Sequence, residues 1–224
     1  MLKKNCASWV SPWWFRLKKV AFWVFVCCWL AGCSAEKGPP QEGEVFQVVD
    51  GDTIRLTGGF TLRYLGIDTP ELTSSRSFEK GLAQAAKQAN SELTRGRKLR
   101  LEYDEERYDQ YNRLLAYVFL PDGQMLNEEL VRQGLARVLV VFPNIRYQAL
   151  LILAQQQAIT ARRGWWRELP QAQEPFYVAN TRTRRFHRPA CPGGKKIAQP
   201  NRLILKTPLE AYWQGFSPCR RCQP

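Results

Sequence analysis

The alternation of apolar and polar positions predicts several short strands in the chain. Strand-like runs cover residues 44–49, 53–56 and 60–66, and Asp-Gly and Gly-Gly turns separate them. Two more such runs cover residues 98–103 and 113–120, with a polar loop between them. The pattern therefore predicts five strands, each of the length found in small barrels.

Three stretches with helical character interrupt or follow these strands. An alanine-rich helix is expected over residues 78–96, closed by Gly96, and further helices over residues 125–135 and 147–163. Five short strands with a helix after the third fit a five-stranded Greek-key barrel of the OB type. The predicted fold class is mainly β with α (α+β), an architecture that commonly binds nucleic acid across its face.

The first 32 residues have a different character. Basic residues precede residues 20–32, thirteen largely apolar residues without charge, which is the organisation of a secretion signal and is short for a membrane span. The segment ends in LAGC, which resembles the lipobox of bacterial lipoproteins and implies cleavage before Cys33 and a lipid on its thiol. A non-cleaved anchor is the alternative. Either way we expect export to the periplasmic or extracellular face of the cell envelope, on a polar tether over residues 33–43.

Charge is distributed unevenly along the 224 residues, whose formal net charge is +13. Residues 33–174 hold 18 basic and 19 acidic residues, whereas residues 175–224 hold ten basic residues and one acidic residue, Glu210. A short basic tail on a near-neutral domain favours contact with a polyanion, nucleic acid first and anionic lipid second. A merely soluble basic surface is the alternative.

Four acidic residues lie close together beside one arginine. Asp50 and Asp52 share an Asp-Gly-Asp turn, Asp68 follows the third expected strand, and Glu71 comes three residues later. Carboxylates in this arrangement suit a hard cation with oxygen ligands and bound waters. Arg63 precedes Asp68 by five residues, and its guanidinium can hold a phosphate bidentately. Ordinary turn chemistry is the alternative reading of the Asp-Gly pairs.

Catalysis in the predicted barrel would have to use carboxylate, arginine and metal. The only histidine, His187, lies outside the barrel, which offers no cysteine nucleophile and no serine triad. Glu71 is then the candidate that positions or deprotonates water. The alternative is a helix start, because Thr69-Pro70-Glu71 also places a capping residue before a proline.

Several sequence blocks over residues 44–168 resemble the staphylococcal nuclease (thermonuclease) family. They are VVDGDTIRL, RYLGIDTPE, DQYNRLLAYVF and NEELVRQGLARV, and they occur in the family's order. The resemblance implies an OB-fold, calcium-dependent phosphodiesterase that acts on DNA and RNA. It also implies that Asp52 and Asp68 bind calcium through their carboxylates. Thr69 would add its backbone carbonyl, and Asp50 would support the metal without binding it.

The same resemblance assigns the residues that act on the substrate. Arg63 and Arg113 would hold the attacked phosphate, Glu71 would activate water, and Tyr111 matches a substrate-binding position. Three positions at the rim of the expected site depart from the best-known members, which have a lysine, a glycine and a tyrosine there. They are Gln110, Asn112 and Val140. The departures bear on substrate affinity and base preference more than on the reaction.

The tail holds the spacing His-x3-Cys, 27 residues, then Cys-x2-Cys, formed by His187, Cys191, Cys219 and Cys222. Two close pairs of such ligands suit a closed tetrahedral zinc site, which would let a small basic module fold around little core. The alternative is a disulfide in an oxidising compartment, which would leave one of the three thiols unpaired.

Residues 176–224 resemble the metal-binding domain of Ada-type DNA-methylation repair proteins, and residues 169–175 form the expected linker. The resemblance implies a small zinc-ribbon-like module. In that family the first ligand is a cysteine that accepts a methyl group, so His187 in its place argues against methyl transfer. Contact with DNA is still expected from a set of tail arginines, Arg182, Arg184, Arg185 and Arg188.

The leading hypothesis is an exported, lipid-anchored nuclease of DNA and/or RNA that uses Ca²⁺ in catalysis and Zn²⁺ in its structure. The rival hypothesis is a non-catalytic lipoprotein that captures nucleic acid. A DNA-repair sensor is disfavoured by the signal sequence and by His187. The sequence suggests no protein partner.

Overall fold

The computed structural model describes residues 38–224. The expected signal peptide, the lipid site Cys33 and the first part of the expected tether lie outside the described residues. Within residues 38–224, no helix combines the length and the apolar character needed to cross a membrane.

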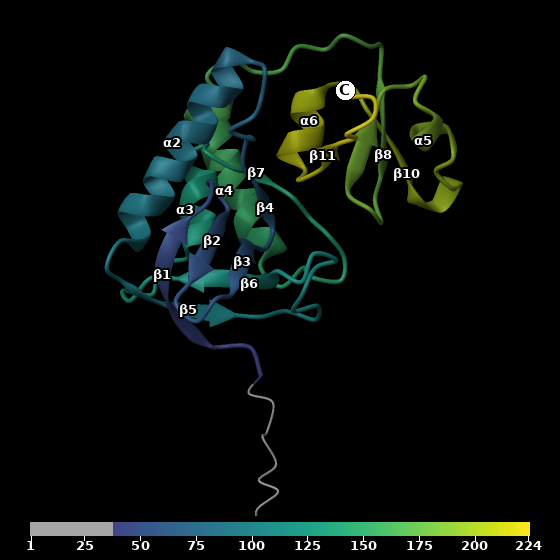
Figure 1. Ribbon diagram of the computed structural model, residues 1–224. Coiled ribbons are helices and arrows are strands. Elements are labelled where there is room, and N and C mark those ends of the chain that lie inside the picture. Colours follow the sequence, from purple (N-terminus) through teal and green to yellow (C-terminus); the bar gives the residue numbers. More distant parts are fainter. Residues whose placement is uncertain (1–37) are drawn as a thin grey trace, which may run out of the picture. The chain divides into compact units, whose positions relative to one another are not determined.

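A closed five-stranded barrel forms the first half of the described chain, with strand order β1-β2-β3-β6-β5 (Figure 1). Its strands are β1 (Glu42–Val48), β2 (Thr53–Leu56), β3 (Thr61–Tyr64), β5 (Lys98–Glu102) and β6 (Leu114–Phe119). All pairs are antiparallel except β3 with β6. The predicted α+β fold with an OB-type barrel is confirmed.

The barrel begins earlier than the sequence suggested. Glu42 and Gly43, placed in the tether by their composition, belong to β1 because they pair with Arg100 and Leu99 of β5 and so close the barrel. This pairing is a long-range contact, and the local polar composition of the segment gives no sign of it.

The expected third strand over residues 60–66 is interrupted. Gly66 has φ +77°, and a Cβ there would lie 2.4 Å from a methyl carbon of Leu151, so the chain turns at this glycine. Beyond it a separate short strand, β4 (Ile67–Asp68), pairs with β7 (Arg137–Val138) outside the barrel. The turn places Asp68 directly opposite Arg137.

Three helices accompany the barrel: α2 (Ser77–Thr94), α3 (Leu126–Arg132) and α4 (Gln148–Thr160). The buried face of α2 consists of small or polar residues, Ala83, Ala86, Asn90 and Thr94. Their spacing puts them on one side of the helix, where short side chains allow close approach to the turn between β1 and β2.

The tail forms a four-stranded sheet of order β10-β8-β9-β11 with two short helices. Its elements are β8 (Tyr177–Asn180), β9 (Arg185–His187), α5 (Pro192–Lys195), β10 (Arg202–Leu205), α6 (Pro208–Trp213) and β11 (Ser217–Pro218). Short 3₁₀ turns at Gly164–Trp166 and Gln199–Asn201 complete the described chain.

The tail does not stand apart from the barrel domain. Its core residues Phe186 and Tyr212 share one apolar cluster with Ala158 and Ile159 of α4 and with Trp166. Residues 38–224 therefore contain two apolar cores, and the second is built jointly by α4 and the tail sheet.

Candidate active site and metal centre

The turn between β1 and β2 is held rigidly. Asp50 Oδ1 accepts a hydrogen bond of 3.0 Å from the Asp52 amide, and Asn90 of α2 donates to the carbonyls of Asp50 and Gly51 at 3.1 and 3.3 Å. A Cβ on Gly51 would lie 2.6 Å from Cβ of Ala86. The turn is thus packed directly on α2, and Asp50 stabilises it by accepting the hydrogen bond from the Asp52 amide.

Asp52 is the most enclosed acid of the site, with 5% of its surface exposed. Its Oδ2 accepts hydrogen bonds of 2.8 Å from both the amide and the hydroxyl of Thr69, and lies 3.1 Å from Nη1 of Arg63. Burial raises the pKa of Asp52 and the Asp50 charge adds to the rise, while Arg63 and the Thr69 hydrogen bonds oppose it. The net direction is upward, which is typical of a carboxylate buried beside a second acid.

Arg63 joins two carboxylates. Its Nη2 lies 3.2 Å from Asp68 Oδ1, while Nη1 also donates to the Tyr64 and Ile67 carbonyls at 3.1 Å. Asp52 and Asp68 therefore converge on one cationic group, although they come from different strand pairs. Two carboxylates that already share a cation, beside the Thr69 backbone, form a donor set that fits a hard divalent ion.

Glu71 is exposed and lies in a turn, where its carbonyl accepts a hydrogen bond of 3.1 Å from the Ser74 amide. Helix α2 begins only at Ser77, so the alternative reading of Thr69-Pro70-Glu71 as a helix start is wrong. The reason is the serine-rich segment that follows, in which Ser74 donates to Glu79 at 2.6 Å and forms its own turn. The Glu71 carboxylate is left free of capping duties.

Arg113 lies in the loop before β6, and Asp109 holds it there. The Asp109 carboxylate accepts from the Arg113 amide at 2.9 Å and from its Nε at 2.7 Å. Burial raises the pKa of Asp109, but the hydrogen bonds from Arg113 and Tyr111 outweigh it and leave this pKa lowered. Within residues 38–224, no hydrogen bond or ion pair links Arg113 to Asp52 or Asp68.

Tyr111 is 71% exposed, and the Arg113 guanidinium lies 5.5 Å from its ring centroid. The two line a hollow of about 430 Å³ with Phe60 and Tyr108. Asn112 between them has φ +60°, a conformation that asparagine tolerates well, so the turn does not need glycine at this position. An exposed ring beside a guanidinium suits a stacked base next to a phosphate.

The four predicted zinc ligands meet in the tail. Donor atoms of His187, Cys191, Cys219 and Cys222 all lie within 4.8 Å of one another, and Sγ of Cys191 is 3.4 Å from Nδ1 of His187. All three cysteines are free thiols, so the structure does not contain the alternative disulfide. Three sulfurs and one imidazole nitrogen at this mutual distance fit one tetrahedral zinc ion.

The surroundings of these ligands also suit a metal-bound thiolate. Burial raises the pKa of Cys191, but backbone hydrogen bonds from Gly194 and Gly193 leave it lowered. The Arg188 amide donates to Sγ of Cys222 at 3.4 Å, although burial raises the pKa of that thiol to about 12. A Cβ on Gly193 would come within 3.3 Å of Nδ1 of His187. The loop is therefore fitted closely around the donor atoms.

The four tail arginines predicted to bind substrate differ in their placement. Arg188 is occupied by Glu174 at 3.2 Å and by the Cys222 carbonyl at 3.1 Å, and Arg184 lies 4.1 Å over the Phe216 ring and donates to the Gln214 carbonyl. These two are thus committed to internal contacts. Arg182 is exposed at a turn and Arg185 lines a cleft, so these two are the members better placed to reach a phosphate.

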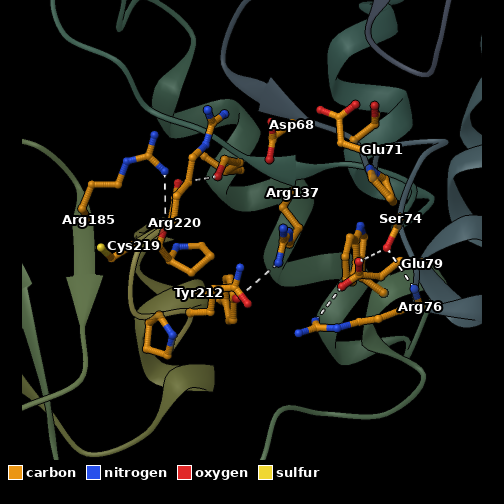
Figure 2. Close-up of a pocket in the computed structure, with 18 of the residues that line it drawn as sticks. Asp68, Glu71, Ser74, Arg76, Glu79, Arg137, Arg185, Tyr212, Cys219 and Arg220 are labelled. Atoms are coloured by element: carbon orange, nitrogen blue, oxygen red, sulfur yellow. Dashed lines mark hydrogen bonds and ion pairs between the residues drawn. The ribbon is translucent and has the colours of Figure 1, made fainter. Parts of the chain in front are cut away.

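A cleft of about 690 Å³ connects the acidic site with the tail. Figure 2 shows Arg185, Cys219 and Arg220 on one side and Glu71, Ser74 and Glu79 on the other, with Asp68 and Arg137 between them. Burial and the charge of Arg220 lower the pKa of Arg185, while Asp68 raises it. The tail therefore supplies one wall of a cleft whose other wall carries Asp68 and Glu71.

Three residues of the site were not predicted from the sequence. Asn90 anchors the acidic turn, Asp109 holds Arg113, and Arg137 faces Asp68 across the β4–β7 pair. A signal existed for Asp109 alone, because an Asp four residues before an Arg in a turn is a common local pair. Asn90 and Arg137 act through contacts between distant segments.

Comparison with known proteins agrees with both halves of the described chain. The family model "Staphylococcal nuclease homologue" matches residues 61–168, and "Metal binding domain of Ada" matches residues 155–224. The two matches overlap over residues 155–168, the end of α4 and the turn after it, which is where the two apolar cores meet.

Three curated relatives each match slightly more than half of this chain. Thermonuclease of Staphylococcus hyicus is 36% identical over 129 residues, which are 56% of this chain and 76% of the relative. SPbeta prophage-derived endonuclease YokF and endonuclease YncB, both of Bacillus subtilis (strain 168), are 42% and 39% identical over 125 residues. These residues are 54% of this chain but only 42% and 59% of the two relatives.

The tail matches the Ada-type metal-binding domain. The closed barrel, its paired carboxylates and the similarity to thermonuclease all indicate one family. The chain belongs to the staphylococcal nuclease family.

Proposed function

We propose that the chain is a calcium-dependent nuclease that hydrolyses phosphodiester bonds of DNA and/or RNA. The observation that carries this proposal is the convergence of Asp52 and Asp68 on Arg63, with the unencumbered Glu71 carboxylate on the adjoining turn. A basic clamp for phosphate, a pair of acids for a cation and a free base are the parts that metal-assisted hydrolysis needs.

The residues divide the reaction as follows. Glu71 takes a proton from a water molecule as the water oxygen bonds to phosphorus. The opposite P–O bond breaks, its electron pair leaves with the departing sugar oxygen, and that oxygen takes a proton from solvent. Arg63 and Arg113 stabilise the negative charge that develops on the phosphoryl oxygens. Calcium held by Asp52, Asp68 and the Thr69 carbonyl would supply Lewis-acid polarisation of the phosphate.

Both arginines are paired with acids, and Arg63, which is shared between two carboxylates, must give up contacts before it binds phosphate. Arg63 is paired with Asp52 and Asp68, and Arg113 with Asp109. A divalent cation bound by Asp52 and Asp68 would neutralise these carboxylates in place of Arg63. Donors of Arg63 would then be free for the substrate. Calcium would therefore be needed to release Arg63 as well as to polarise the phosphate.

We also propose that the nuclease is exported and anchored to the cell envelope by a lipid on Cys33. The support is the basic, apolar and LAGC sequence of the leader. Structural zinc would be held in the tail by His187, Cys191, Cys219 and Cys222. The folded tail would assist binding of nucleic acid.

The test is cleavage of single-stranded and duplex DNA by the chain with calcium, with magnesium and with a chelator, beside Glu71→Gln. We expect calcium-dependent cleavage that falls by roughly 10²–10⁴ in the variant. Glu105→Gln, which removes an exposed acid from the loop before β6, is the matched control and should keep full activity. Tight binding without cleavage in every metal would support the rival capture function.

A further inference from the structure

The cleft that joins the acidic site to the tail is rich in arginine. Arg137, Arg185 and Arg220 all line it. Within the described residues, none of these three arginines forms an ion pair, whereas Arg76 on the facing wall is paired with Glu79 at 2.9 Å. Three guanidinium groups beside one cleft without acidic partners favour an anionic ligand.

Each of the three arginines is positioned by a different part of the fold. Arg137 stacks 4.1 Å from the Trp165 ring centroid and donates to the Tyr212 hydroxyl at 3.3 Å. Arg185 donates to the Pro218 carbonyl at 3.4 Å, and Arg220 is exposed beside the zinc ligand Cys219. Two of these contacts use single donors, so other donors of Arg137 and Arg185 remain for a ligand.

The position of this charge relative to the acidic site identifies the ligand. Arg137 lies opposite Asp68 in the β4–β7 pair, and Asp68 and Glu71 line the same cleft as the arginines. A chain of phosphates running out of the acidic site would enter the cleft and meet them. The volume of about 690 Å³ is that of a small-molecule pocket, which suits one or two nucleotides of a single strand.

We propose that Arg137, Arg185 and Arg220 form a second phosphate subsite, which holds a phosphodiester of a single nucleic-acid strand beyond the bond being cleaved. This rests on the proposed nuclease function and makes the tail a part of the substrate site. The hollow at Tyr111 and Arg113 shares no lining residue with this cleft, so the strand has a separate place for a base.

The experiment compares two substrates of the zinc-loaded full chain: a single-stranded 12-mer, and a dinucleotide with one phosphodiester. In Arg220→Gln, the ratio of kcat/KM for the 12-mer to kcat/KM for the dinucleotide should fall about tenfold, the loss expected for one charged hydrogen bond. The salt dependence of 12-mer binding should weaken by about one counterion. Arg220→Lys should recover part of the ratio.

Lys206→Gln is the control, because Lys206 is an exposed cation of the same tail that does not line the cleft. Zinc content and melting temperature of each variant show whether the tail is folded. An unchanged ratio in a folded Arg220→Gln variant would overturn the subsite, as would an equal loss in Lys206→Gln. An equal loss for a 12-mer duplex would overturn the restriction to single strands.

The result is separable from the proposed function. If the unaltered chain cleaves neither substrate, the nuclease proposal fails, and calorimetric binding of the same 12-mer to the chain and to Arg220→Gln still decides the subsite. If cleavage occurs but the ratio does not move, only the subsite fails.

Discussion

At the residue scale, the site depends on a buried carboxylate whose neighbours are fixed one by one. Asp52 is surrounded by the Thr69 amide and hydroxyl and by Arg63, and Asn90 secures the turn that carries it. Because the turn lies against the small residues of α2, the acid has little freedom to move. A donor set of this rigidity holds its geometry before a ligand arrives.

Gly51→Ala should disturb this arrangement. The added methyl would lie 2.6 Å from Ala86 Cβ and 2.7 Å from Thr69 Cγ2, and overpacking of this kind costs about 1–3 kcal/mol of unfolding free energy. Gly81→Ala is the matched control, because Gly81 lies on helix α2 and its added methyl would meet nothing within 4 Å. This change should stabilise the fold by about 0.5–1 kcal/mol. Chemical denaturation measures both, and equal effects of the two changes would contradict the close contact.

Asp109→Asn should weaken the hold on Arg113. The lowered pKa of Asp109 means that its contribution to stability is present at pH values above its unfolded pKa of about 4 and is lost as the pH falls through the folded value. Melting temperatures between pH 7 and pH 3 should therefore drop less steeply in the variant. The variant should also raise KM for DNA, and an unaltered KM together with an unaltered pH profile would argue against the role.

At the element scale, α4 serves both halves of the described chain. Gln155 accepts from the Val138 amide of β7 at 2.8 Å and donates to the Tyr212 carbonyl of α6, while Gln156 donates to the Trp213 carbonyl at 3.0 Å. The Ser217 hydroxyl donates to the Val138 carbonyl at 3.0 Å. One helix thus fixes β7 and the tail together, and β7 carries Arg137.

Gln155→Leu removes both of its hydrogen bonds and leaves buried backbone groups without partners. Each such group costs about 1–3 kcal/mol, so the variant should lose several kcal/mol of unfolding free energy. Gln157→Leu, exposed on the same helix, should have little effect. The Gly215 amide donates to the same Tyr212 carbonyl as Gln155, at 2.9 Å. Hydrogen exchange of the Val138 and Gly215 amides should therefore rise in Gln155→Leu, and unchanged exchange would show that the glutamine does not couple the two halves.

The barrel strands, the acidic cluster and the meeting of His187 with the three tail cysteines were predictable because local patterns encode them. Alternation marks the strands, Asp-Gly-Asp marks the turn, and ligand spacing marks His187 and the cysteines. The break of the third strand at Gly66 was not predictable, because it comes from the approach of Leu151. The internal contacts of Arg184 and Arg188 were also missed, since composition counts charge but does not show where a guanidinium points.

At the scale of the whole described region, the zinc cluster and the cleft belong to one structure. Cys219 belongs to the His-Cys cluster proposed to hold zinc and also lines the cleft, and the tail core includes residues of α4. Unfolding of the tail should therefore weaken substrate binding in the cleft beside Asp68 and Glu71.

Removal of zinc by a zinc-selective chelator should lower the melting temperature, because structural zinc contributes directly to the folding free energy of a small module. Cleavage of the 12-mer should fall more than cleavage of the dinucleotide. Added zinc should restore the melting temperature and the cleavage, whereas added calcium should restore neither of them. A stripped protein with unchanged melting and unchanged cleavage would show that the cluster binds no structural metal.

The joint core over α4 has a consequence for how such chains can be recombined. A crossover placed in the apparent linker at residues 169–175 would unite an α4 with a tail that did not evolve against it, and would break the glutamine contacts and the shared apolar cluster. A crossover before Gln148 would transfer helix and tail as one heritable block. Inheritance of the tail among nucleases should therefore follow the ancestry of α4 rather than that of the barrel strands.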